Sequence, residues 1–139
     1  MNSVRILLVS VLVALLSACE PKSPSDVFLI PRERLVLEER DGNSGDLAAI
    51  KRLIAHYDAT SGNERAAEKW RAKARSFGDA QELHSYAAGL SVRALAEPDP
   101  LKKRRILTEA LESAKRSYKN DPDVSTQDLI YEIERSLAG

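Results

Sequence analysis

The chain has 139 residues, of which 21 are lysine or arginine and 21 are aspartate or glutamate, so its formal net charge is zero. Proteins that bind nucleic acid through its phosphates need an excess of basic side chains, and this balance argues against that class. A single cysteine excludes a disulfide bond within the chain. Few aromatic residues and an abundance of alanine, leucine and charged residues favour helices over sheets.

The first 18 residues have the pattern of an export signal. One positive charge, Arg5, precedes an almost wholly apolar run at residues 6–16. This run is shorter than the ~20 apolar residues that a transmembrane helix needs. We therefore expect residues 1–18 to be a signal peptide that is cleaved from the mature protein.

The apolar run ends at the tetrad Leu16-Ser17-Ala18-Cys19. The tetrad resembles the lipobox of bacterial lipoproteins, in which the cysteine is lipidated and becomes the first mature residue. The resemblance implies diacylglycerol and palmitate chains on Cys19, and such chains hold a protein at a bilayer because each buried CH₂ contributes ~0.8 kcal/mol. A cleaved signal with a free Cys19 and a poor membrane anchor are the alternatives.

Glu20 stands where an aspartate favours retention in the inner membrane in the lipoproteins that this chain resembles. We therefore expect the periplasmic face of the outer membrane of a Gram-negative bacterium. Residues 19–26 carry the lipidated cysteine and a proline- and serine-rich tether, which clears the lipid headgroups at ~3.1 Å per extended residue. In residues 27–44, an apolar run is followed by Pro31, and both a short helix through Arg40 and an extended arm fit this pattern.

Residues 45–139 have a helical pattern throughout, because apolar residues recur at the spacing of one helix face. Turn and capping residues divide this segment into expected helices at 46–58, 64–76, 79–96 and 100–119, and a last helix from Ser125. Asn63 is an expected N-cap, and Ser125 with Asp128 resembles a capping box. The spacing of Trp70 with its apolar neighbours predicts that its side chain is part of the core.

The pairs Gly45-Asp46 and Gly78-Asp79 lie 33 residues apart, which indicates an internal repeat. Apolar positions 47, 50, 53, 54 and 57 correspond at this period to positions 80, 83, 86, 87 and 90, which are also apolar. With the alanine-rich run at 66–74, these residues resemble the tetratricopeptide repeat and the related Sel-like repeat. The resemblance implies an all-α fold, a short stack of antiparallel helical hairpins of about two and a half units. An unrelated helical bundle with chance spacing is the alternative.

In tetratricopeptide-type stacks the first helix of each hairpin lines a concave face that binds a partner. The resemblance therefore makes the non-core residues of the helices at 46–58 and 79–96 candidates for partner binding: Lys51, Arg52, His56, Gln81, His84, Ser85 and Arg93. Three of these residues are permanently positive and none is acidic. We expect an acidic protein or peptide segment as the partner, bound more weakly as salt rises.

A second basic feature is the run Lys102, Lys103, Arg104 and Arg105. It lies in the first turns of a helix, where the macrodipole favours negative charge. Nearby acids are one possible compensation, with Arg105 and Glu109 at the i,i+4 spacing of an ion pair. An external anion, either lipid headgroups or an acidic partner, is the other.

Catalytic chemistry has little support in this sequence. His56 and His84 are the only histidines, and a paired metal or acid–base site is conceivable, but no spaced histidine–carboxylate motif accompanies them. Ser85 follows His84 directly on a helix, where adjacent side chains point about 100° apart and cannot form a nucleophile–base pair. We therefore expect no catalytic residue, no metal and no cofactor.

The sequence thus predicts a non-enzymatic, lipid-anchored adaptor that binds a protein partner. An immunity lipoprotein that neutralises a secreted toxin is the alternative among binding proteins, because some periplasmic immunity proteins have Sel-like repeats. An envelope enzyme is the rival from another class. Fold resemblance alone does not decide between them.

Overall fold

The computed structural model describes residues 27–139, and the expected signal peptide, Cys19 and tether lie outside this range. The described part is all-α and contains no strand, which confirms the predicted fold class, a short stack of helical hairpins. No helix in this range is long and apolar enough to cross a membrane. The helices are α2 (Arg32–Asn43), α3 (Leu47–Asp58), α4 (Glu64–Ser76), α5 (Ala80–Leu95), α6 (Pro100–Asn120) and α7 (Val124–Ala138).

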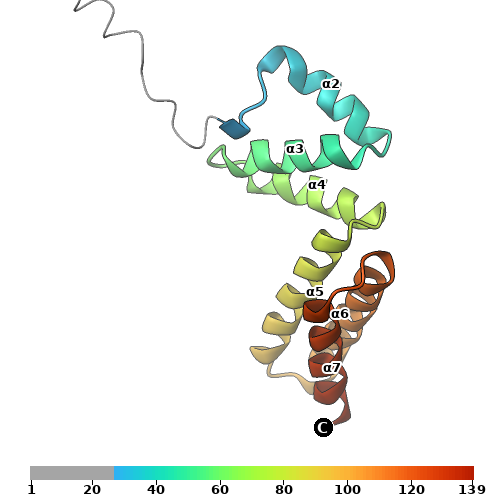
Figure 1. Ribbon diagram of the computed structural model, residues 1–139. Helices are drawn as coiled ribbons and strands as arrows, with labels where there is room; N and C mark the ends of the chain where they lie inside the picture. The colour runs from blue at the N-terminus through green and yellow to red at the C-terminus, as the bar shows by residue number, and fades with distance from the viewer. Residues whose placement is uncertain (1–26) are drawn as a thin grey trace, which may run out of the picture.

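The helices form two groups that meet at a corner (Figure 1). Helices α2, α3 and α4 pack together at one end of the molecule, and α5, α6 and α7 pack together at the other. The α3–α4 hairpin lies across the direction of the three later helices. Only α4 and α5 pack on each other across the corner, and each group has its own hydrophobic core.

The first core surrounds Trp70, whose side chain is only 3% exposed. Ile50, Leu53 and Ile54 of α3 pack with Trp70 and with Ala74 of α4. Helix α2 approaches this core through Gly42, because a Cβ atom there would lie 2.9 Å from the Trp70 ring. The prediction that Trp70 belongs to the core is therefore confirmed.

The second core is rich in alanine, which lets α5 and α6 pack closely. The hydroxyl groups of two buried α6 serines reinforce this contact. Ser113 donates a hydrogen bond to the carbonyl of Leu83 (3.1 Å), and Ser117 donates one to the carbonyl of Ala80 (2.7 Å). Ile133 of α7 is 2% exposed and packs in the same core as the buried residues of α5 and α6.

The two glycine–aspartate pairs have the same local structure. Gly45 and Gly78 adopt left-handed conformations, with φ values of 100° and 84°, just after a helix end. In both pairs the aspartate N–H donates to the carbonyl oxygen five residues earlier, at 3.1 and 3.0 Å. Asp46 and Asp79 then accept hydrogen bonds from the first turn of the next helix. Each pair therefore ends one helix and caps another.

The N-terminal segment combines the two predicted alternatives. A 3₁₀ turn at residues 27–28 and an irregular stretch at 29–31 precede α2, which continues to Asn43 rather than ending at Arg40. Glu38 and Gly42 are buried on α2 because this helix packs along α3. Packing on α3 thus extends the helix past the expected turn.

One predicted cap is wrong. Helix α7 begins at Val124, and Asp123 caps it by accepting bonds from the N–H and hydroxyl groups of Thr126 (2.9 and 2.5 Å). Ser125 therefore lies inside the first turn of α7 and not at the predicted capping position. Asn63 occupies the N-cap position of α4, as predicted, although its side chain makes no capping hydrogen bond.

Replacing Trp70 by alanine is expected to lower the free energy of unfolding by about 3–5 kcal/mol, because the packed indole leaves a cavity. Urea denaturation followed by circular dichroism measures this loss without relying on the only tryptophan. Tyr131→Ala is the control: this side chain is 66% exposed, and its loss should change stability by less than about 0.5 kcal/mol. A loss below about 1 kcal/mol for Trp70→Ala would contradict a core role.

Candidate functional site

Lys51, the first predicted partner-binding residue, already has a partner within the chain. Its ammonium group lies 2.8 Å from Oδ2 of Asp79, whose side chain is 6% exposed. The other carboxylate oxygen of Asp79 accepts a hydrogen bond from the N–H of Glu82 at the start of α5. Lys51 therefore links α3 to the beginning of α5.

Arg52 is also held by a buried carboxylate. Its Nε and Nη2 atoms donate to Oε2 of Glu38 at 2.9 and 2.7 Å, and Arg34 donates to Oε1 of the same residue at 3.2 Å. The hydrogen bond with Glu38 raises the pKa of Arg52 above its ordinary value. Arg52 thus neutralises Glu38 and links α3 to α2.

The two histidines hold separate parts of the chain. Nδ1 of His56 accepts a hydrogen bond from the N–H of Ile30 (3.1 Å), and Nδ1 of His84 lies 2.8 Å from the Thr126 hydroxyl oxygen. Since Thr126 donates its single hydroxyl hydrogen to Asp123, its oxygen is the acceptor for His84. This bond from Thr126 lowers the pKa of Asp123.

Most of the predicted partner-binding residues border separate hollows of the described chain. Helices α3 and α5, which were expected to line one groove together, do not pack on each other. Three of the predicted residues are exposed on α5: Gln81, Ser85 and Arg93. Ser85 and Arg93 border a hollow beside α4, whereas Gln81 borders a different hollow beside α7. Lys51 and Arg52 are drawn to buried carboxylates, because a buried charge needs a partner.

A different groove lies between α5 and α7, with a volume of about 270 Å³. Its walls and floor are mostly small or apolar side chains from three helices. They are Ala88, Ser91, Val92, Ala94 and Leu95 of α5, Lys103 and Leu107 of α6, and Leu129, Glu132, Ile133 and Ser136 of α7.

This groove exists because α7 packs along α6 and meets α5 over only a short length. The His84–Thr126 contact joins the early turns of α5 and α7, whereas the groove residues belong to the later turns of both helices. Val92 and Leu95 are consequently 68% and 77% exposed. Large apolar side chains that gather beside a groove are typical of a binding surface.

The hydroxyl groups in the groove are already satisfied by their own helices. Ser91 donates to the carbonyl of Ala87 (3.0 Å), and Ser136 donates to the carbonyl of Glu132 (2.9 Å). The groove therefore offers mainly apolar contact. The side chains of Lys103 and Glu132 supply the charges at its border.

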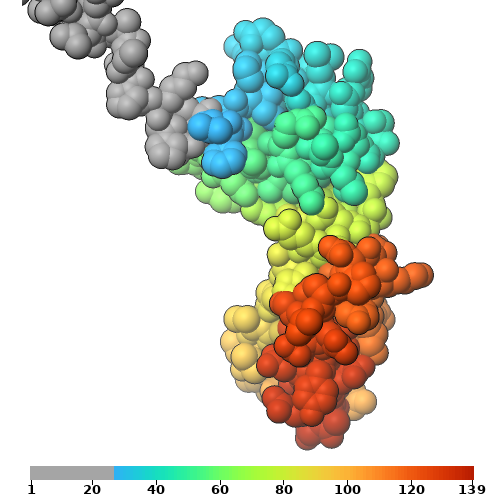
Figure 2. All heavy atoms as spheres, viewed as in Figure 1, coloured from blue at the N-terminus to red at the C-terminus, as the bar shows by residue number. Residues whose placement is uncertain are grey.

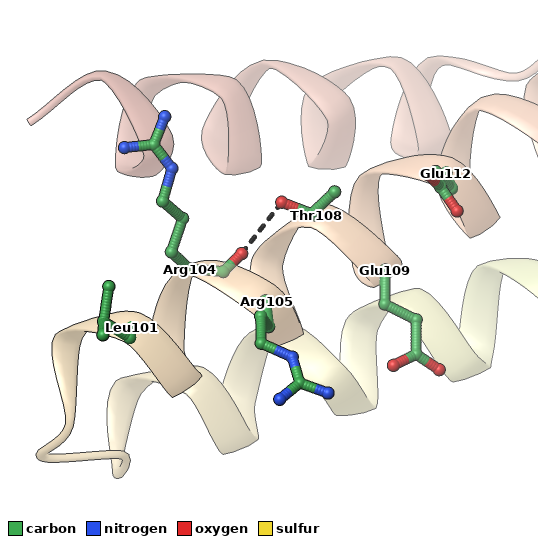
Figure 3. Close-up of a pocket in the computed structure, with 6 residues that line it drawn as sticks. All are labelled: Leu101, Arg104, Arg105, Thr108, Glu109 and Glu112. Carbon is green, nitrogen blue, oxygen red and sulfur yellow. Dashed lines mark hydrogen bonds between the residues drawn. The ribbon is translucent and has the colours of Figure 1, made fainter.

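The basic run at 102–105 distributes its charges around α6. Lys103 borders the groove, whereas Arg104 and Arg105 lie on the outer face of the helix and extend in different directions (Figure 3). None of the ion pairs within residues 27–139 involves any of these four residues.

The predicted Arg105–Glu109 ion pair does not form. Instead, Glu109 accepts a hydrogen bond from the hydroxyl group of Tyr86 on α5 (2.5 Å). This bond, with burial as a second cause, raises the pKa of Tyr86. Within the described range, no nearby acidic side chain therefore forms an ion pair with Arg105.

The shallow depression drawn in Figure 3 is not an enclosed site. All six of its lining residues belong to α6, so no second element faces them across the hollow. A ligand there would remain largely in contact with solvent. Within the described range, no three or more histidine, cysteine, aspartate or glutamate side chains are grouped as metal ligands.

The sequence did contain a signal for the groove. Ala88, Val92 and Leu95 follow the i, i+4, i+7 spacing of a second apolar stripe on the helix that carries the core residues. Our sequence prediction missed this groove, because it expected this side of α5 to line a concave face together with α3. Glu38, the acceptor for Arg52, had no distinguishing pattern in the sequence.

Arg52→Ala should lower the free energy of unfolding by about 1–2 kcal/mol, because the buried Glu38 loses two of its donors while the hydrogen bond from Arg34 remains. Arg93→Ala is the matched control: Arg93 is an exposed arginine that takes part in no ion pair of residues 27–139. This control should change stability by less than about 0.5 kcal/mol. Equal effects of the two changes in urea denaturation would contradict the structural role of Arg52.

Comparisons with protein families, with curated proteins and with solved structures found no match for this chain.

Proposed function

We propose that this protein is a lipid-anchored, non-enzymatic adaptor of the bacterial envelope that binds a protein partner in the groove between α5 and α7. The observation that carries the proposal is the exposure of Val92 and Leu95 beside this groove. Burying apolar surface provides most of the driving force for protein association. A groove between two helices also suits an amphipathic helix or an apolar peptide segment.

The size of the groove favours a peptide anchor over a small organic ligand. The groove is open to solvent, and its volume of about 270 Å³ lies just below the usual range of small-molecule sites, ~300–1,000 Å³. Such a space accommodates one or two apolar side chains. The rest of a partner would extend over the surface around it.

The charges beside the groove define the second part of the partner. Lys103 borders the groove, and Lys102, Arg104 and Arg105 are its neighbours in the chain on α6; none of the four forms an ion pair within the described chain. Acidic side chains that flank the apolar anchor would complement them. We therefore propose a partner segment with apolar anchors and acidic neighbours, and place the contact on α5, α6 and α7 rather than on α3.

The proposed location rests on the tetrad that ends at Cys19. Lipid on this residue would hold the adaptor at the periplasmic face of the outer membrane, with the helical body outside the bilayer. Anchoring of this kind requires no transmembrane helix, because acyl chains supply the membrane affinity.

Leu95→Glu should abolish partner binding without changing stability, because this side chain is 77% exposed beside the groove. Leu101→Glu is the matched control, since Leu101 is 75% exposed but lies outside the groove. A photo-crosslinking residue at position 92 would capture the partner in intact envelopes, and its yield should fall for Leu95→Glu alone. Raising the salt concentration should also lower the yield, because the basic side chains are exposed.

Equal crosslinking in both variants would exclude the groove as the contact surface. A captured partner without an acidic segment would contradict the proposed charge complementarity. A captured secreted toxin would make the protein an immunity lipoprotein that uses the same groove.

Cys19→Ser should leave uncleaved precursor and abolish labelling by a fatty-acid probe, because the thiol is the acceptor of the lipid. The measurement compares probe incorporation and gel mobility of the two proteins in growing cells. Unchanged labelling of the serine variant would exclude lipidation at this position.

A further inference from the structure

The first described residues form an exposed apolar cluster outside both cores. Val27, Phe28 and Leu29 are 77%, 55% and 42% exposed. Three consecutive bulky apolar side chains in contact with water are unfavourable unless another surface covers them. We call these three residues the N-terminal apolar arm.

The arm is held in place at its C-terminal end. The N–H of Ile30 donates to Nδ1 of His56 (3.1 Å), and the Ile30 side chain packs partly against the core around Trp70. The following residues enter α2 through Pro31. The arm is therefore attached to the body at the residue that follows it.

The short chain between Cys19 and the arm determines what can reach it. Eight Cα–Cα steps separate Cys19 from Val27, and a fully extended chain covers at most ~3.3–3.6 Å per residue, or about 28 Å. A lipid on Cys19 would keep the arm within this distance of the bilayer. No other described apolar cluster is so close in sequence to the anchor.

We propose that Val27, Phe28 and Leu29 insert into the interfacial region of the bilayer that carries the Cys19 lipid. This inference rests on the lipid anchor of the proposed function. Arg32, exposed in the first turn of α2, follows Leu29 by three residues and takes part in no ion pair of residues 27–139. Its guanidinium group would meet lipid phosphates, and a basic residue beside apolar ones is typical of interfacial segments.

Insertion of the arm would orient the whole molecule. The start of the described chain lies at one end of the body, and α7 lies at the opposite end (Figure 2). An arm in the bilayer would place the α2–α4 group near the membrane. The groove between α5 and α7 would then be held away from the lipid surface, where a periplasmic partner can reach it.

The test uses the chain from Cys19 to Gly139, which contains every described helix, coupled through its only cysteine to a maleimide phospholipid in vesicles. Phe28→Trp adds a reporter in the arm, and Tyr131→Trp adds one at an exposed site on α7. The unaltered chain, with Trp70 alone, provides the baseline. We expect a blue shift and quenching by lipids with brominated acyl chains for the Phe28→Trp reporter only.

Absence of quenching at position 28 would overturn the inference. A blue shift without quenching would assign the arm to a protein contact, such as a second copy of the chain, and would also overturn it. Chemical coupling makes the result independent of lipidation in cells. Loss of the cellular anchor would be detected by fatty-acid labelling, so failure of the proposed function and failure of this inference are distinguishable.

Discussion

The relative position of the two helical groups depends on the carboxylate of Asp79. One of its oxygens accepts the N–H of Glu82 and so caps α5, while the other lies 2.8 Å from the ammonium group of Lys51 on α3. Gly78, in a left-handed conformation, reverses the chain just before it, and the Asn120 side chain donates to the Gly78 carbonyl (2.7 Å). The two cores share little packing, so these polar contacts set the corner between them.

This arrangement explains why the basic residues Lys51 and Arg52 of α3 stabilise the fold. Glu38 and Asp79 are carboxylates with almost no solvent exposure, and the free energy of burying them is acceptable only when cations and N–H groups surround them. Arg52 forms an ion pair with Glu38, and Lys51 forms one with Asp79. Removing either cation would leave a buried charge short of partners, which mainly affects stability and the geometry of the corner.

The surfaces left for interaction lie at the two ends of the molecule and differ in chemistry. The end near residue 27 exposes a short apolar arm that is followed by Ile30, the residue bonded to His56. The α5–α7 end exposes an apolar groove bordered by Lys103, which forms no ion pair in the described chain. The arm is a short run of consecutive side chains, whereas the groove is formed between helices, and the two shapes suit different partners. A bilayer at the first and an acidic protein segment at the second are consistent with a tethered adaptor.

The sequence by itself determined the helices of residues 46–120, the burial of Trp70 and the equivalence of the two glycine–aspartate pairs. These features depend on local periodicity, capping and glycine conformations, which act within a few residues. Only the tertiary structure decided which charges remain free for a partner. Arg52 meets Glu38 because α2 folds back along α3, and Glu109 meets Tyr86 rather than Arg105 because α5 packs against α6. The sequence also could not predict the groove. Whether Val92 and Leu95 are covered depends on the distance between α5 and α7, and this distance is set by the packing of both helices on α6 rather than by any local sequence pattern.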